Sequence, residues 1–233
     1  LPCMATLACQ HQLPEFGRGR FVHVNSPGHA RVQRSVVGLV VVMFAIYFID
    51  SLGFLRLLNA PVYMNTAWQS PDPSIRLFIG GVHVAAALIA GILYANLDVR
   101  ALFLWIFGIF ALVHLMYGFH NRLVPGMTAP LTMPMLYATA VSMYTVVNFA
   151  IWADISTPST VALRTAVGVA LSGWTATFLS TSLAIRWRLT GMPLLEHLNI
   201  VDALAMICFA AMLLLVYLHP KPGRRHGTSR ELP

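Results

Sequence analysis

Six long apolar runs constrain this sequence more than any other feature. They cover residues 35–58, 75–95, 101–119, 131–153, 161–185 and 199–218. An α-helix needs about 20 mainly apolar residues to cross the roughly 30 Å of hydrocarbon in a bilayer, and each run is close to that length. None of the runs alternates between polar and apolar residues, as a strand of a transmembrane β-barrel would. The runs therefore predict an all-α membrane protein with six transmembrane helices that contacts the lipid bilayer directly.

The composition agrees with this class and argues against a nucleic-acid partner. Of the 233 residues, 58% are hydrophobic and only 10% are charged, whereas soluble domains carry about 25% charged residues. A nucleic-acid-binding module would gather its basic residues into a stripe or patch. Here the net charge of +7 comes from basic residues at the chain ends and at the edges of the apolar runs. We therefore expect no nucleic-acid partner.

The basic residues also predict an orientation in the membrane. Six spans place both termini on one side, and that side would hold ten basic residues against five on the other. Basic residues beside spans are retained in the cytoplasm, so we expect both termini there. Arginine strongly outnumbers lysine, which indicates a GC-rich genome and hence a bacterial inner (plasma) membrane.

The predicted organisation is a polar basic arm (1–34), a six-helix transmembrane domain (35–220) and a basic cytoplasmic tail (221–233). The chain starts at Leu1 rather than Met, so we expect either a processed protein or a fragment; the arm has no apolar core, which predicts no signal peptide.

A short polar joint separates the second and third runs. The joint reads "GILYANLDVRALFL" and begins at Gly91. It resembles the cytoplasmic signature of major facilitator superfamily transporters, Gly-x-Leu-Ala-Asp-Arg-x-Gly-Arg-Arg, followed by an apolar helix. Gly91 and Leu93 match in register, Arg100 matches the last basic position, and Asp98 occupies the place of the second glycine. On physical grounds, we expect Asp98 to offset the charge of Arg100 at the start of the next helix.

A second stretch carries the same resemblance. "WADISTPSTVALRTAVGVALSG" is similar to the link between the tenth and eleventh helices of that family, where an acid, a Ser/Thr-Pro turn and a base recur. Asp154, Pro158, Arg164 and Gly168 fit this pattern. Together with six spans, the two stretches resemble the C-terminal six-helix half of a major facilitator protein. The resemblance implies a half-size secondary transporter of a small solute, without enzymatic activity or a cofactor. It also implies a second six-helix half, supplied by a homo-oligomer or by other membrane subunits.

Four ionisable residues lie inside the runs: Asp50, His83, His114 and Asp202. Such residues are costly in a membrane and point to function. Antiparallel threading places the first three at a similar depth, so they could bind a polar solute or relay protons. His83 and His114 could instead ligate a haem or another tetrapyrrole. A third interpretation is that each histidine caps a neighbouring helix or meets water near the membrane surface.

Polar and small residues in the runs give further candidates. Asn148 and Trp152, with Trp174 and Thr177 of the next run, could line a cavity or simply join helices by hydrogen bonds and packing. His83 shares a helix face with Ala87 and Gly91, whose small side chains favour close helix contact. That close contact argues against a macrocycle beside His83. We also expect the shortest links to make consecutive spans packed neighbours.

The transporter interpretation has an alternative of a different class. Only one six-helix half is present, and few charges lie within the spans. Both features are also typical of a non-catalytic transmembrane subunit of a larger, for example bioenergetic, membrane complex. In that case the arm 1–34 would be an attachment strap.

Overall fold

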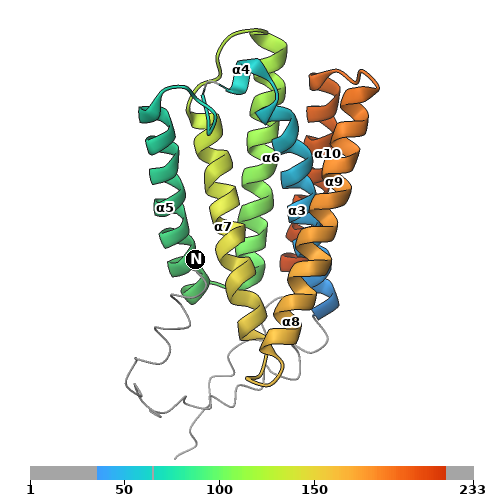
Figure 1. Ribbon diagram of the computed structural model, residues 1–233. Helices are drawn as coiled ribbons and strands as arrows, with labels where there is room; N and C mark the ends of the chain where they lie inside the picture. The colour runs from blue at the N-terminus through green and yellow to red at the C-terminus, as the bar shows by residue number, and fades with distance from the viewer. Residues whose placement is uncertain (1–35, 65, 219–233) are drawn as a thin grey trace, which may run out of the picture. The chain divides into compact units, whose positions relative to one another are not determined.

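The computed structural model describes residues 36–64 and 66–218. All regular structure in them is helical (Figure 1), in the order α3 Val36–Leu58, α4 Pro61–Met64, α5 Pro73–Asn96, α6 Val99–Leu123, α7 Thr132–Asp154, α8 Val161–Gly168, η2 Val169–Trp174, α9 Thr175–Leu189 and α10 Leu194–Leu218. The predicted arm, and the tail with its flanking residues 219–220, lie outside the described residues.

Six spans are long and apolar enough to cross a membrane within the described part of the chain. The fifth is composite, because α8, the π-helix η2 and α9 follow one another without a break from Val161 to Leu189. The predicted all-α membrane fold is thus confirmed. The main boundary error concerns α10, which begins at Leu194 rather than at 199 because polar Glu196 and His197 belong to its first turn.

The helices pack around a centre formed by α3, α6, α7 and α10. α6 lies against α7 and α10, and α3 lies against α9, η2 and α10. α5 packs on α7 at the edge of the bundle and barely contacts α6, although only Leu97 and Asp98 separate α5 from α6. The expectation that this short link makes α5 and α6 packed neighbours is therefore wrong: a short link fixes antiparallel direction, but side-chain fit selects the neighbour.

The two ends of the bundle carry different elements. The α4 end holds α4 and the turn between α9 and α10, and the Asp98 end holds the α5–α6 joint and α8 (Figure 1). At the Asp98 end, the Asp98 carboxylate accepts a 2.9 Å hydrogen bond from the backbone N–H of Arg100. Asp98 thus caps the N-terminus of α6, where a carboxylate is favoured by the unpaired N–H groups and the helix dipole.

Candidate functional site

Asp50 lies in the middle of α3 and faces α7. Its two carboxylate oxygens accept hydrogen bonds from the Tyr137 hydroxyl at 2.8 Å and from the Tyr144 hydroxyl at 2.6 Å. The Tyr137 hydroxyl also lies 2.9 Å from the backbone carbonyl of Asp50. Among the described residues, no arginine, lysine or histidine nitrogen lies within hydrogen-bonding distance of this carboxylate. Asp50 is therefore an acid inside a span that is held by two hydroxyls and not by a cation.

Tyr137 connects Asp50 with both predicted histidines. Its ring contacts the His114 ring at a centroid distance of 5.7 Å and the Trp68 ring at 5.9 Å. The indole N–H of Trp68 donates to His83 Nε2 at 2.9 Å, and His83 Nδ1 lies 2.8 Å from the Ser142 hydroxyl. We call Asp50, Tyr137, Tyr144, His114, Trp68 and His83 the interior cluster.

His114 meets α3 at a glycine. The ring nitrogen Nδ1 lies 2.8 Å from the Phe110 carbonyl, one turn earlier in α6, and Nε2 is buried without a hydrogen-bond partner. That second nitrogen points at Gly53, where an added Cβ would lie only 2.3 Å away. His114 is fully buried, so close contact between the two helices at this point requires a residue without a side chain.

Four successive residues of α3 contact four different helices. Asp50 binds α7, the Ser51 hydroxyl lies 3.3 Å from that of Thr177 in α9, and Gly53 faces α6. The Leu52 carbonyl accepts a 2.8 Å hydrogen bond from His197 of α10. Polar contacts between helices are the specific element of membrane bundles, where lipid does not drive helices together. This turn of α3 therefore fixes the position of four neighbours.

The α4 end of the interior cluster is closed by aromatic packing. The Tyr63 ring of α4 contacts the Tyr117 ring edge-on at 4.8 Å, and its hydroxyl lies 3.3 Å from the Tyr117 carbonyl. Burial raises the pKa of the Tyr63 hydroxyl to about 12. The space left between these residues and Trp68 measures about 10 Å³, which is at the lower limit for one water molecule.

The two predicted haem ligands do not face one another. Both ring nitrogens of His83 already have partners, Trp68 and Ser142. His114 has one nitrogen at the Phe110 carbonyl and the other directed at the α3 backbone. The shared-iron interpretation is therefore wrong for this arrangement. Within the described residues, no group of three histidine, cysteine or acidic side chains lies close enough to hold a metal ion.

The sequence predicted that Ala87 and Gly91 make a close helix contact beside His83, and this prediction is wrong by one position. An added Cβ at Gly91 would meet nothing within 4 Å, so Gly91 makes no close helix contact. The buried small residues of α5 are Ala86 and Ala90, each one position earlier than the predicted pair Ala87 and Gly91. An error of one residue rotates a helix face by about 100°.

The remaining polar candidates inside the spans form no hydrogen bond with the interior cluster among the described residues. Asp202 of α10 has a buried oxygen, Oδ1, without a hydrogen-bond partner. Asn148 accepts a 3.0 Å hydrogen bond from the Trp152 indole one turn later in the same helix. Trp152 packs on Gly168, where an added Cβ would lie 2.6 Å from the ring. Asn148 and Trp152 thus join α7 to α8, which agrees with the packing interpretation and not with a cavity.

The motif residues at the Asp98 end form contacts between neighbouring helices. The Asp154 carboxylate accepts a 2.6 Å hydrogen bond from the Tyr94 hydroxyl of α5. Arg164 donates to the backbone carbonyl of Ile155, which closes the link between α7 and α8. Asp98 and Arg100 are exposed. These contacts join α5, α7 and α8 at one end of the bundle.

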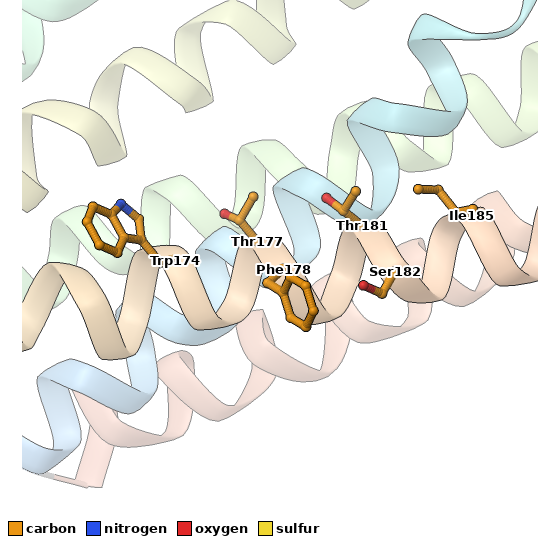
Figure 2. Close-up of a pocket in the computed structure, with 6 residues that line it drawn as sticks. All are labelled: Trp174, Thr177, Phe178, Thr181, Ser182 and Ile185. Carbon is orange, nitrogen blue, oxygen red and sulfur yellow. The ribbon is translucent and has the colours of Figure 1, made fainter.

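A shallow groove of about 520 Å³ runs along α9 on the outside of the bundle (Figure 2). Its residues recur every three or four positions along the composite fifth span, one from the end of η2 and five from α9: Trp174, Thr177, Phe178, Thr181, Ser182 and Ile185. Trp174 and Thr177, predicted to share a cavity with Asn148 and Trp152, line this groove without them. Trp174 is 74% exposed and Phe178 70%, so the groove faces the surroundings of the bundle.

The sequence missed the two tyrosines that hold Asp50. Tyr137 and Tyr144 are seven residues apart, which places them on one face of α7. A buried tyrosine hydroxyl needs a hydrogen-bond partner, so this spacing is a usable signal. It identifies an acceptor on a facing helix, although it does not say which one.

No protein-family model, no curated protein and no solved structure matches this chain. The class of the protein therefore rests on its own structure. Six apolar helices of spanning length define an integral membrane protein.

Proposed function

We propose that this protein is a half-size secondary transporter of facilitator type, which moves a small solute and has no enzymatic activity. In this proposal Asp50 binds the proton or cation whose movement is coupled to the solute. The observation that carries the proposal is the Asp50 carboxylate, held inside a span by two tyrosine hydroxyls and, within residues 36–64 and 66–218, by no basic side chain.

The physical argument concerns the cost of that carboxylate. An ionised side chain inside a bilayer costs several kcal/mol unless it is paired, and such residues mark ion and proton pathways. Two tyrosine hydroxyls satisfy hydrogen-bonding capacity but leave the negative charge uncompensated. A proton or a small cation at Asp50 would remove that charge, and its release would restore it.

The interior cluster supplies groups that could pass a proton to or from Asp50. A histidine ring can take up and release a proton, and the buried ring of His114 lies against that of Tyr137, the residue that binds Asp50. His83 joins the same tyrosine through Trp68. Asn148, Trp152 and Asp202 form no hydrogen bond with Asp50 or its two tyrosines in the described part of the chain, and they have no part in this version of the pathway.

The remainder of the transport proposal concerns assembly and orientation. Secondary transporters place their site between two structural repeats, so the proposal includes a second six-helix half, most simply a second copy of this chain. The Asp98 end, with the motif residues Gly91, Asp98, Arg100, Asp154 and Arg164, would face the cytoplasm together with both termini. The membrane would be the inner membrane of a bacterium.

Reconstitution into liposomes tests the proposal. Vesicles that contain a pH-sensitive dye would be exposed to pools of amino acids, sugars, carboxylates and organic cations, and proton entry would be followed. We expect at least one pool to drive proton flux through the native protein and not through Asp50→Asn. Asp154→Asn is the matched control, since it changes an exposed acid at the bundle end. Absence of flux with every pool, and with sodium in place of the proton gradient, would refute transport.

A second candidate function is favoured by α9: a non-catalytic subunit of a larger membrane complex. The composite fifth span has a mean hydropathy of 1.2, the lowest of the six. Its exposed groove carries the hydroxyls of Thr177, Thr181 and Ser182 beside Trp174 (Figure 2). Hydroxyl side chains on a membrane-facing surface are typical of helix–helix interfaces.

Mass spectrometry of the protein purified in mild detergent separates the two candidates. A stoichiometric set of unrelated membrane proteins would support the subunit. A homo-oligomer alone, together with flux in liposomes, would support the transporter. Thr181→Leu, which removes one groove hydroxyl, should weaken whichever association uses this face, and Thr139→Leu on α7 is the control.

A further inference from the structure

The α4 end of the bundle brings three basic side chains together from different helices. Arg56 lies in the last turn of α3, Arg188 in the last turn of α9 and His197 in the first turn of α10. Arg56 donates to the Met192 carbonyl, and the Met192 N–H donates in turn to the carbonyl of Trp187, the residue before Arg188. His197 packs on the Trp187 ring, so these contacts bring all three basic residues to one corner of the bundle. We call them the basic trio.

Two members of the basic trio, Arg56 and His197, are held in place by specific contacts. The Arg56 guanidinium donates to the Met192 carbonyl at 2.9 Å, in the turn between α9 and α10. His197 lies 2.8 Å from the Leu52 carbonyl through Nε2, and its ring packs edge-on against Trp187 at a centroid distance of 5.1 Å. His197 is fully buried. These contacts fix the direction of the nitrogens that remain.

Two of those remaining nitrogens have no partner. Arg56 Nε and His197 Nδ1 are both buried and accept or donate no hydrogen bond. Among the described residues, no carboxylate forms an ion pair with Arg56 or Arg188. A buried polar atom without a partner destabilises the folded protein.

Helix dipoles account for single arginines at these positions but not for the group. A helix C-terminus favours a cation, which explains Arg56 and Arg188 taken separately. It does not explain why Arg56 and Arg188 end at the same corner of the bundle, nor why Arg56 Nε and His197 Nδ1 stay unpaired. An oxyanion would compensate the charges and accept hydrogen bonds from an arginine fork.

We propose that the basic trio is a binding site for a phosphate-class oxyanion. The site lies where helices end at the membrane surface, so the oxyanion could be the headgroup of an anionic lipid or a phosphate-bearing solute in water. Arg56 and Arg188 would bind the anion directly. His197 Nε2 donates to the Leu52 carbonyl, so Nδ1 would accept a hydrogen bond from a protonated phosphate oxygen or, with the ring protonated, donate one. This site is separate from Asp50 and stands whether or not the protein is a transporter.

Thermal unfolding of the purified full chain in neutral detergent tests the site. Inorganic phosphate would be compared with chloride at equal ionic strength. At about 100 times its dissociation constant, phosphate should raise the Tm of the native protein by roughly 5 °C. Arg188→Gln, on an exposed residue, should weaken phosphate binding about 10-fold. Arg186→Gln is the matched control, since it removes the same charge from the same helix end and should keep the native response.

A second arm identifies the source of the oxyanion. Nanodiscs of phosphatidylcholine alone would be compared with nanodiscs that also contain phosphatidylglycerol, and retained lipid would be counted by native mass spectrometry. Retention of phosphatidylglycerol that Arg188→Gln abolishes and Arg186→Gln preserves assigns the site to a lipid headgroup. A response to free phosphate alone assigns it to a soluble anion.

Two results would overturn the site. One is that neither phosphate nor phosphatidylglycerol binds to the native protein. The other is an equal loss in Arg188→Gln and Arg186→Gln, which would indicate general attraction of anions to a basic surface. Arg56→Gln serves as a second variant; if it does not fold, Arg188→Gln alone decides.

Discussion

Two tyrosine–aspartate hydrogen bonds of the same length lie in different surroundings in this bundle. The Tyr144 hydroxyl binds Asp50 at 2.6 Å in the interior, and the Tyr94 hydroxyl binds Asp154 at 2.6 Å at the Asp98 end. Tyr144 is 5% exposed, whereas the second bond is open to its surroundings. Where water can replace a lost partner, a hydrogen bond contributes little; where it cannot, the orphaned group is costly. Equal geometry therefore predicts unequal consequences.

The largest difference between the two sites is expected from loss of the acids. Asp50→Ala leaves the Tyr144 hydroxyl without its acceptor and leaves the Tyr137 hydroxyl only the backbone carbonyl of residue 50. An orphaned buried hydroxyl costs about 1–3 kcal/mol, so we expect a loss of about 3 kcal/mol in the free energy of unfolding, measured by steric trapping in bicelles. Asp154→Ala should cost less than about 1 kcal/mol, because its site is exposed. Equal losses of stability in Asp50→Ala and Asp154→Ala would contradict the prediction that burial makes the Asp50 hydrogen bonds more important.

The next largest effect on the free energy of unfolding is expected from an alanine at Gly53, compared with an alanine at Gly91. Gly53→Ala places a methyl group 2.3 Å from the position of His114 Nε2, so α3 and α6 must move apart. Overpacking of this kind costs about 2 kcal/mol, and we expect the displacement to weaken the Asp50 hydrogen bonds as well.

Gly91→Ala is the control for that glycine, since an added Cβ there meets nothing within 4 Å. Alanine favours a helix by about 1 kcal/mol over glycine, so Gly91→Ala should be neutral or stabilising. Both changes are measured by unfolding, and backbone amide exchange at Asp50 reports the displacement. Destabilisation by Gly91→Ala of the size found for Gly53→Ala would show that a hidden contact exists at Gly91.

Removal of the interior tyrosine hydroxyl gives a smaller effect. Tyr144→Phe leaves one oxygen of Asp50 without its donor while keeping the ring, which contacts Tyr47 at 5.0 Å. We expect about 1.5 kcal/mol of destabilisation, because the bond involves a carboxylate. The same variant should alter the pH dependence of any proton flux measured in liposomes, since one of the two groups that hold Asp50 is lost.

The smallest effect is expected at the Asp98 end. Tyr94→Phe removes the bond to Asp154, and water can take the place of the hydroxyl. We expect a change of about 0.5 kcal/mol or less and unchanged flux. A loss as large as that of Tyr144→Phe would mean that Asp154 is shielded from water in the assembled protein, for example by a second copy.

The spans could be predicted from the sequence because membrane burial depends on length and hydropathy, which are local properties. The starts of α3 and α8 fall within one residue of the predicted runs. The end of α9 and the start of α10 were missed because Arg186, Arg188 and His197 interrupt the apolar pattern. Charged residues at a helix end are compatible with a span whose last turn reaches the membrane surface.

The interior cluster was harder to predict from the sequence, because it depends on which faces of different helices meet. Asp50, His83 and His114 were predicted to share a depth, and one shared tyrosine and its Trp68 neighbour connect them. The depth came from counting residues along helices. Counting could not identify the connecting residue, Tyr137, because the depth of a residue does not define the direction in which its side chain leaves the helix axis. The same ignorance of rotation produced the error at Gly91 and the false pairing of the histidines.

The π-helix η2 has a consequence for how α9 presents its side chains. In η2 the backbone N–H of Thr175 donates to the Ala170 carbonyl, five residues earlier, which is the bonding pattern of one residue inserted into an α-helix. Every residue after Trp174 is therefore rotated by about 100° from the direction that an uninterrupted α8 would give it. Deletion of one residue in η2 would reverse that rotation without shortening any other helix. It would turn Thr177 away from Ser51 and move the groove hydroxyls to another face of the bundle. One inserted residue therefore decides which side chains α9 exposes.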